Sequence, residues 1–395
     1  MLIETANLAA TAASALTERN ALYERFFRSE AERLAQACRA MADRFLNGGR
    51  LLAFGSGPYA TDAQHVSVEF VHPVIVGKRA LPALDLSMNF VASVNALVRA
   101  EDIAMGFAGP EGDAAVESVL KCAADHGAMT FALSGRSGTY CFEAITSDGF
   151  RHQELIEILY HTLWETVHVF FERQQVGQDA GDAAFLYPFL GGEKTNDSDV
   201  VEEVAASIRM KVEDDARLRL QVAQDQSEGI AAAVLAIGER LRRGGKLILF
   251  GNGGSATDAN DWAIDLVLSG ARGRAIPAIS LSMEPANITA LANDVGTDVI
   301  FLRQLIAHAR PEDVAVAIST SGGSRNIIMA LEEARRRRLL TVGLLGYDGG
   351  EIVRRGLVDH ALVVRCDYIP RIQEVQASIY HTLTELLFEV RNAEV

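Results

Sequence analysis

The sequence predicts an α/β protein made of two tandem domains, each a five-stranded parallel sheet flanked by helices in a flavodoxin-like, doubly wound arrangement. Two observations lead to this prediction. Short apolar runs alternate with helical patterns along both halves, and the motifs of the first half recur in the same order in the second. Apolar strands separated by helices are typical of a parallel sheet that is covered on both faces and has right-handed crossovers.

The expected strands follow from the apolar runs. In the second half they cover residues 246–251, 276–282, 314–319, 340–345 and 360–365. In the first half they cover residues 50–55, 81–87, 103–107, 128–133 and 141–146. The first half is shorter between Leu97 and Asp102, where the second half carries 295–311, so we expect it to lack one helix.

Four matched segments support the internal repeat. Residues 50–55 (RLLAFG) correspond to 246–251 (KLILFG), and ATDA occurs at both 60–63 and 256–259. Residues 81–88 (LPALDLSM) correspond to 276–283 (IPAISLSM), and YHTL occurs at 160–163 and 380–383. We therefore expect domains at 1–175 and 199–395, joined by a linker at 176–198. The apolar stretch 185–190 within that linker is expected to pack on one of the domains.

Composition narrows the class of protein. Hydrophobic residues make up 49% and charged residues 23% of the 395-residue chain. No apolar run approaches the roughly 20 residues of a membrane-spanning helix, and the amino terminus does not resemble a secretory signal. We expect a cytoplasmic protein with no membrane association.

Charge and cysteine usage exclude further classes. The net charge of −15 argues against nucleic-acid binding, and the basic run at 335–338 is interpreted as the solvated end of a helix. The cysteines Cys38, Cys122, Cys141 and Cys366 show no zinc-finger or CxxC spacing, so we interpret them as reduced thiols.

Two glycine- and serine-rich loops of the second half are candidate phosphate sites. Residues 251–255 (GNGGS) and 319–324 (STSGGS) each follow a strand and open a helix. Backbone N–H groups converge at such positions, where the helix dipole favours an anion. Neighbouring parallel strands would bring both loops to the ligand crevice of an open sheet. The corresponding first-half loop, 106–112 (GFAGPEG), lacks hydroxyls, contains Pro110 and adds the charge of Glu111, so we expect it to bind phosphate poorly.

These loops, together with Arg371-Ile-Gln-Glu374 and His381, resemble the phosphoheptose isomerases of the sugar isomerase (SIS) domain family. The resemblance covers the second half and, more faintly, the first. It implies conversion of sedoheptulose 7-phosphate to D-glycero-D-manno-heptose 7-phosphate, with serine loops that hold the phosphate and a Glu and a His that carry the proton transfers. It assigns substrate binding to Asn252, Ser255, Asp294, Ser319, Thr320, Ser321, Ser324 and Gln373.

The resemblance also implies a candidate zinc site in some members and no organic cofactor. The first half matches all four positions of that site, with His65, Glu69, Gln153 and His161. The spacing of each pair places its two side chains near one helix face, and nitrogen and oxygen ligands suit zinc. In the second half Gln373 and His381 remain, but the first two positions are Asp261 and Asp265. Shorter carboxylates would favour a harder cation or no metal.

The first half keeps His65 and Glu69 but has a poor phosphate loop, whereas the second half keeps its phosphate loops but has lost that pair. In the family that the chain resembles, active sites lie between subunits. We therefore hypothesise one composite site. Its phosphate loops, Gln373 and His381 would come from the second half, and His65 and Glu69 from the first. Glu69 and His381 are the expected acid/base pair. The expected metal ligands are His65, Glu69, Gln373 and His381, with Gln153 and His161 as the alternative within the first half. The hypothesis requires that the variant Glu69→Gln lose most of its turnover and that Asp265→Asn keep nearly all of it.

Two departures from the family pattern affect the substrate. Pro370 replaces a family aspartate, although Asp367 is close by, and the pair Asn293-Asp294 has no well-preserved counterpart around Asn95. Another phosphorylated ketose is therefore an alternative substrate, and a non-catalytic sugar-phosphate sensor or scaffold is an alternative function. The expected assembly is a homodimer of tandem chains.

Overall fold

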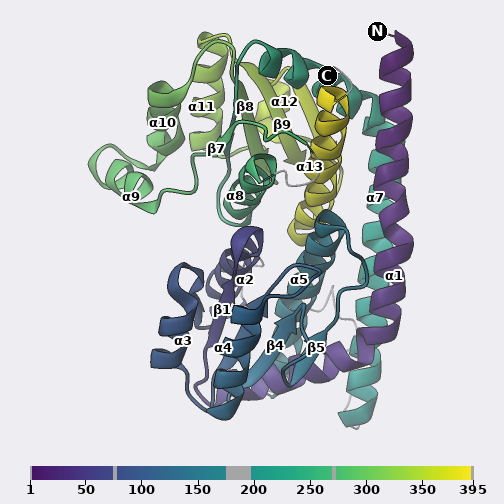
Figure 1. Ribbon diagram of the computed structural model, residues 1–395, viewed down its shortest axis with the longest axis vertical. Coiled ribbons are helices and arrows are strands. Elements are labelled where there is room, and N and C mark those ends of the chain that lie inside the picture. Colours follow the sequence, from purple (N-terminus) through teal and green to yellow (C-terminus); the bar gives the residue numbers. More distant parts are fainter. Residues whose placement is uncertain (1, 74–77, 175–196, 269–272, 393–395) are drawn as a thin grey trace. The chain divides into compact units, whose positions relative to one another are not determined.

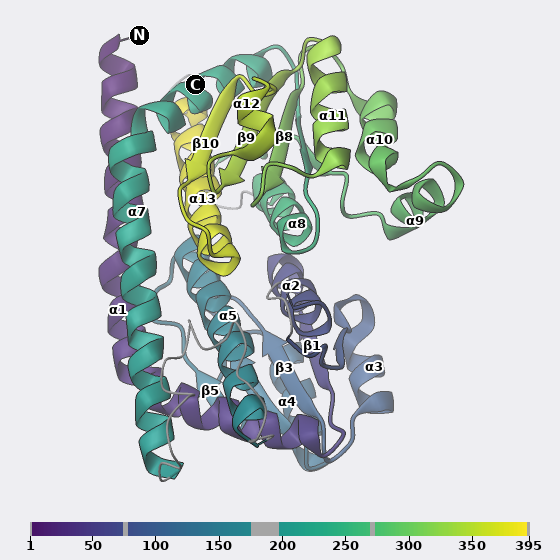
Figure 2. The same cartoon turned by 180° about the vertical axis from the view of Figure 1, so that it is seen from behind.

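The structure is a computed structural model that describes residues 2–73, 78–174, 197–268 and 273–392. It separates into two compact units, one formed by residues 21–214 and the other by residues 1–20 and 215–395. We call them the N-terminal unit and the C-terminal unit. Each contains one five-stranded parallel sheet, as the sequence predicts (Figures 1 and 2).

The N-terminal unit has strand order β2-β1-β3-β4-β5, the flavodoxin-like order. Its strands are β1 (Leu51–Gly55), β2 (Ala83–Asp85), β3 (Ile103–Phe107), β4 (Met129–Leu133) and β5 (Tyr140–Phe142). Its main helices are the later part of α1 (Leu2–Leu46), α2 (Ala60–Val71), α3 (Phe90–Leu97), α4 (Ala114–Asp125), α5 (Gly149–Gln174) and the first part of α7 (Asp197–Arg242).

The C-terminal unit repeats this order as β7-β6-β8-β9-β10. Its strands are β6 (Leu247–Phe250), β7 (Ala278–Ser280), β8 (Val314–Ser319), β9 (Leu340–Gly346) and β10 (His360–Val364). Its further helices are α8 (Gly254–Val267), α9 (Pro285–Asp294), α10 (Ile300–His308), α11 (Arg325–Arg336), α12 (Gly350–Arg354) and α13 (Ile369–Asn392). The helix that the first half was expected to lack is α10, because α3 ends only a few residues before β3 begins.

Two-sided burial explains why the strands are apolar throughout. In the C-terminal unit, Leu247 and Leu249 of β6 join the core under α8 and α13. Ile248 and Phe250 point to the opposite face and join the core under α10 and α11, and Figure 1 shows helices on both sides of this sheet. Alternate residues of a strand face opposite sides, so both sets must be apolar.

The unit boundaries differ from the expected 1–175 and 199–395. Leu8, Ala12 and Leu16 of α1 pack in the core of the C-terminal unit, while Phe27 and Leu34 of the same helix pack in the N-terminal core. At 1.5 Å per residue a 45-residue helix is roughly 68 Å long, more than one small domain can cover. The expected linker lies mostly outside the described residues, as does its apolar stretch 185–190, and α7 begins at Asp197.

Candidate functional site

The two serine loops of the C-terminal unit begin helices at the same edge of the sheet. The first loop joins β6 to α8, and the second joins β8 to α11. Strands β6 and β8 are parallel neighbours, with Leu247 paired to Val314, so both helix N-termini lie at the carboxyl ends of adjacent strands. Gly253, with φ of 56°, allows the turn into α8. This is the arrangement that the sequence predicts for the two loops.

Hydrogen bonds within the second loop shape its backbone. Ser319 Oγ accepts from the Gly322 N–H at 3.1 Å, and Ser321 Oγ accepts from the Gly323 N–H at 3.3 Å. A side chain at residue 322 is excluded, because a Cβ atom there would lie 2.2 Å from the carbonyl oxygen of Gly349. Ser324 is the N-cap of α11, and its hydroxyl makes no capping hydrogen bond. The start of α11 is therefore not capped by the Ser324 hydroxyl, which suits the binding of an external anion.

A reciprocal amide pair connects the two loops. Asn252 Nδ2 donates to Asn326 Oδ1 at 3.0 Å, and Asn326 Nδ2 donates to Asn252 Oδ1 at 2.9 Å. The sequence reasoning selected Asn252 but missed Asn326. Its position in the first turn of α11, on the helix that the serine loop opens, is the signal that could have identified it.

The remaining predicted substrate residues are placed as follows. Ser255 lies in the first turn of α8 and is buried, and Gln373 lies buried on α13. Asp294 is exposed at the end of α9, where Asn293 Nδ2 donates to its carboxylate at 2.8 Å. The segment just after it is held at the serine loop, because Arg325 Nε lies 2.8 Å from Asp298 Oδ2. That ion pair was not predicted.

In the N-terminal unit, α2 and α5 bring three predicted metal-site residues together. His65 and Glu69 lie one turn apart on α2, and His161 lies on α5. The Nε2 atoms of His65 and His161 are 3.4 Å apart, and His65 Nε2 is 3.8 Å from Glu69 Oε1. All three side chains are buried, and one ligand atom from each lies within 4.8 Å of the others. Gln153, also buried on α5, donates its amide N–H to Asp62 at 3.1 Å.

Burial sets the protonation of this cluster. It lowers the pKa of His65 well below its usual value, and the neighbouring His161 lowers it further. Burial also raises the pKa of Glu69 to about 8, and the charge of Glu165 adds to that shift. Glu69 Oε2 is buried and has no hydrogen-bond partner among the described residues. Two imidazole nitrogens and an unpaired carboxyl oxygen at this spacing fit a zinc ion, since that donor set is typical of zinc sites.

The corresponding cluster of the C-terminal unit has a different composition. His381 on α13 has its Nε2 atom 3.1 Å from Asp265 Oδ2 and 3.8 Å from Asp261 Oδ2, both on α8. Tyr380 donates its hydroxyl to Asp261 Oδ2 at 2.7 Å. All of these side chains are buried. The structure thus places His381 beside a carboxylate of its own half, and Tyr380 is a further polar group that the sequence reasoning missed.

The arginine and glutamate of the Arg371–Glu374 motif form an ion pair with each other inside α13. Both side chains are buried. A second buried ion pair, Arg219 with Asp215, reaches the same helix through Arg219 Nε, which donates to Ser378 Oγ at 2.9 Å. Each buried charge is neutralised by its partner. This indicates that Arg371 and Glu374, the two ends of the motif, have a structural role.

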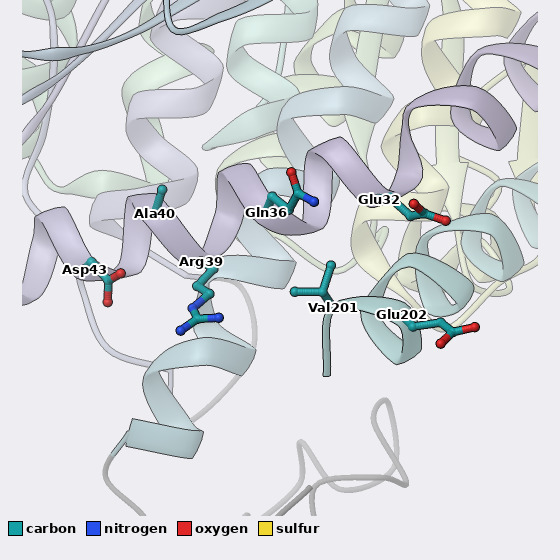
Figure 3. Close-up of a pocket in the computed structure, with 7 residues that line it drawn as sticks. All are labelled: Glu32, Gln36, Arg39, Ala40, Asp43, Val201 and Glu202. Carbon is teal, nitrogen blue, oxygen red and sulfur yellow. The ribbon is translucent and has the colours of Figure 1, made fainter. Parts of the chain in front are cut away.

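One groove of the N-terminal unit is unsuited to a phosphate. It has a volume of about 730 Å³ and lies on the surface of α1 and α7. Figure 3 shows three carboxylates, Glu32, Asp43 and Glu202, against the single guanidinium of Arg39. This excess of negative charge repels an anion.

Comparison with known proteins agrees with this geometry. The family model of the SIS domain matches residues 16–128 and 212–346. The phosphoheptose isomerase of Geotalea daltonii is 41% identical over 181 residues, which cover 46% of this chain and 93% of the relative. That of Pelobacter propionicus is 45% identical over 167 residues, which cover 42% and 87%.

Two solved structures share the fold across nearly the whole chain. The tagatose-6-phosphate ketose/aldose isomerase of Escherichia coli has a TM-score of 0.55 at 11% identity and covers 97% of this chain and 93% of its own. The C-terminal domain of the glucosamine-fructose-6-phosphate aminotransferase of Francisella tularensis has a TM-score of 0.58 at 8% identity, with coverages of 96% and 95%. No helix in the described part of the chain has the length and apolarity needed to span a membrane. The chain belongs to the SIS domain family and is a relative of the phosphoheptose isomerases.

Proposed function

We propose that this phosphosugar isomerase interconverts sedoheptulose 7-phosphate and D-glycero-D-manno-heptose 7-phosphate. The observation that carries the proposal is the pair of serine loops at the ends of β6 and β8, tied together by Asn252 and Asn326. Two relatives named phosphoheptose isomerase, which are 41% and 45% identical over their matched regions, support a phosphorylated heptose as the substrate.

The C-terminal loops are the proposed phosphate site. The hydroxyls and backbone N–H groups at the two helix N-termini would surround the phosphate, where the helix dipoles favour its charge. The residues proposed for this role are Ser255, Ser319, Thr320, Ser321 and Ser324. Asn252, Asp294 and Gln373 are proposed to bind the sugar hydroxyls. The phosphate then acts as a handle that orients the reacting carbons.

The proposed reaction is a proton transfer between neighbouring carbons. From the ketose, a base removes a proton from C1 to form an enediolate, and the proton is returned at C2, while a second group moves the proton from the C1 hydroxyl to the C2 oxygen. Glu69 is proposed as the base because it is the buried carboxyl that the resemblance assigns to proton transfer, and in the metal-free protein burial raises its pKa to about 8. His381 is proposed as the group that serves the oxygens.

The zinc site is proposed at His65, Glu69 and His161, with Gln153 beside them on α5. A zinc ion held there would supply Lewis-acid polarisation of substrate oxygens. The cluster of Asp261, Asp265 and His381 offers mostly oxygen ligands. Separate variants of Glu69 and Asp265 test which half supplies the base.

The deciding experiment is turnover of purified full-length protein with sedoheptulose 7-phosphate, following aldose formation with and without a chelator. In Ser319→Ala/Ser321→Ala we expect KM to rise about a hundredfold or more, since each of the two lost charge-assisted hydrogen bonds costs about 1.5–3 kcal/mol. Ser29→Ala is the matched control, because the Ser29 hydroxyl donates to the Phe26 carbonyl of its own helix at 2.8 Å, away from both loops in the chain. Binding of the sugar phosphate without turnover would instead support the sensor alternative, and no binding would refute both.

A further inference from the structure

The loop at residues 106–112 of the first half can be compared residue by residue with the serine loop at 319–324 of the second half. Ile103 of β3 and Val314 of β8 hold the same position in their sheets, because they pair with Leu51 and Leu247, the first residues of β1 and β6. Asp113 and Ser324 follow at the same distance along the chain, and each is the N-cap of the next helix. The two loops therefore differ in side chains rather than in position.

The N-terminal loop already holds an anion of its own at the start of α4. Asp113 Oδ1 accepts from the backbone N–H groups of Ala115 and Val116 at 2.8 and 3.0 Å. Its other oxygen accepts from the Ser56 hydroxyl at 2.6 Å. The bond from Ser56, together with these backbone N–H groups, lowers the pKa of Asp113, so the carboxylate is ionised. The donors that a phosphate would need are thus already used.

A tyrosine covers the same loop. Tyr59 occupies the position that Ser255 holds in the second half, counted from the first glycine of each loop. A Cβ atom on Gly109 would lie 2.9 Å from the Tyr59 ring and 3.2 Å from its hydroxyl oxygen, so the ring rests directly on the loop backbone. His152 flanks it with ring centroids 6.0 Å apart, and its Nε2 atom lies 3.1 Å from the Ala108 carbonyl oxygen. The counterpart of Gly109 in the second half is Thr320, and the counterpart of Tyr59 there is the much smaller Ser255.

The charged side chains around the loop at 106–112 also disfavour phosphate binding. A pocket of about 490 Å³ beside it is lined by four carboxylates, those of Glu111, Asp113, Glu117 and Glu143. The guanidinium of Arg136 is its one basic group, and it lies 3.8 Å from Glu143. A phosphate entering here would meet a net negative field.

We propose that Tyr59 and Asp113 close the N-terminal crevice to phosphate, so that each chain binds one sugar phosphate rather than two. Asp113 supplies the anion that the helix terminus attracts, and the Tyr59 ring fills the space above the loop. The inference rests on the proposed phosphate role of the C-terminal loops and adds that the second copy of the site is blocked by its own side chains.

The test is a graft of the second-half loop into the first half. The substitutions Ala108→Ser, Pro110→Ser, Glu111→Gly and Asp113→Ser restore its hydroxyls and retain Gly109. The stoichiometry of sedoheptulose 7-phosphate binding is measured by calorimetry on the full chain, with thermal unfolding as the folding control. We expect one site per chain in the wild type and in the graft that keeps Tyr59, and two sites when Tyr59→Ser is added.

The outcomes separate this inference from the proposed function. Two sites in the wild type, or no gained site in the graft with Tyr59→Ser, would overturn the blocking role of Tyr59 and Asp113. A wild type without any site would remove the proposed C-terminal phosphate site, yet a gained site in the full graft would still support the inference.

A reciprocal pair of variants probes the same charge effect in the C-terminal loop. Ser324→Asp should weaken binding on the order of a hundredfold, because a carboxylate would lie within a few ångströms of the phosphate. Ser324→Ala, which loses only a hydroxyl, should weaken it about tenfold or less. Equal effects of the two variants would contradict the role given to the carboxylate of Asp113.

Discussion

Glu69→Gln should lower activity and raise stability at the same time. Glu69 is buried, and its pKa rises from an ordinary 4.5 to about 8. A carboxyl whose folded pKa is raised stabilises the fold fully below pH 4.5, and that contribution is lost as the pH rises towards 8. At pH 7 the metal-free wild type therefore loses up to about 3 kcal/mol of folding free energy at this residue. Glutamine has the same shape and removes that loss.

The assays are turnover of sedoheptulose 7-phosphate and urea unfolding of chelator-treated protein at pH 7. We expect kcat to fall about 10²- to 10⁴-fold, as for loss of a positioned acid or base. We expect the free energy of unfolding to rise by up to about 3 kcal/mol.

Asp265→Asn is the matched control, because its carboxylate already bonds His381 at 3.1 Å. It should lose about 1–3 kcal/mol of stability and keep kcat within about tenfold. A Glu69→Gln protein that remains active, or that is less stable than the wild type at pH 7, would refute the reasoning. If Asp265→Asn instead lost most of its activity, the removal of the carbon-bound proton would be assigned to the C-terminal cluster.

Three further results are expected. Zinc added to chelator-treated protein should raise the melting temperature by several degrees. His161→Ala should abolish this rise, and His381→Ala should retain it. A wild type whose melting temperature does not change would exclude the site. Burial lowers the pKa of His152 to about 4, so the wild type should lose stability as the pH falls from about 6.5 to about 4.5. Its free energy of unfolding should fall by up to about 3 kcal/mol more than that of His152→Gln. An equal fall in the two proteins, measured by urea unfolding, would contradict this. Asn252→Ala, which breaks the pair with Asn326, should raise KM about tenfold with little change in kcat, whereas an unchanged KM would separate the pair from substrate binding.

The strands and loops could be predicted because their signals are local. The run 314–319 predicted β8 at the same residues, and the glycine and serine loops were correctly placed between strand and helix. The i,i+4 spacing of His65 and Glu69 likewise predicted that both lie on one face of α2, and the structure shows that both side chains are buried. A strand covered on both faces must be apolar throughout, and such a run is visible in the sequence itself.

The unit boundaries could not be predicted in the same way. The repeat motifs lie in the sheets, whereas the boundaries depend on how α1 and α7 pack. A long helix with apolar residues along its length gives no indication of which core each turn joins. Leu16 and Phe27 of α1 enter different cores, and only the packed structure assigns them.

The sequence by itself determined the fold class and the places of the two glycine- and serine-rich loops between strand and helix, because periodicity and glycine placement act within a few residues of the chain. Tertiary structure alone decided which polar groups meet, including His65 with His161, Asn252 with Asn326, and Tyr59 with the backbone at Gly109. Those partners are separated by many residues, and their contact depends on how helices and loops pack around the finished sheet.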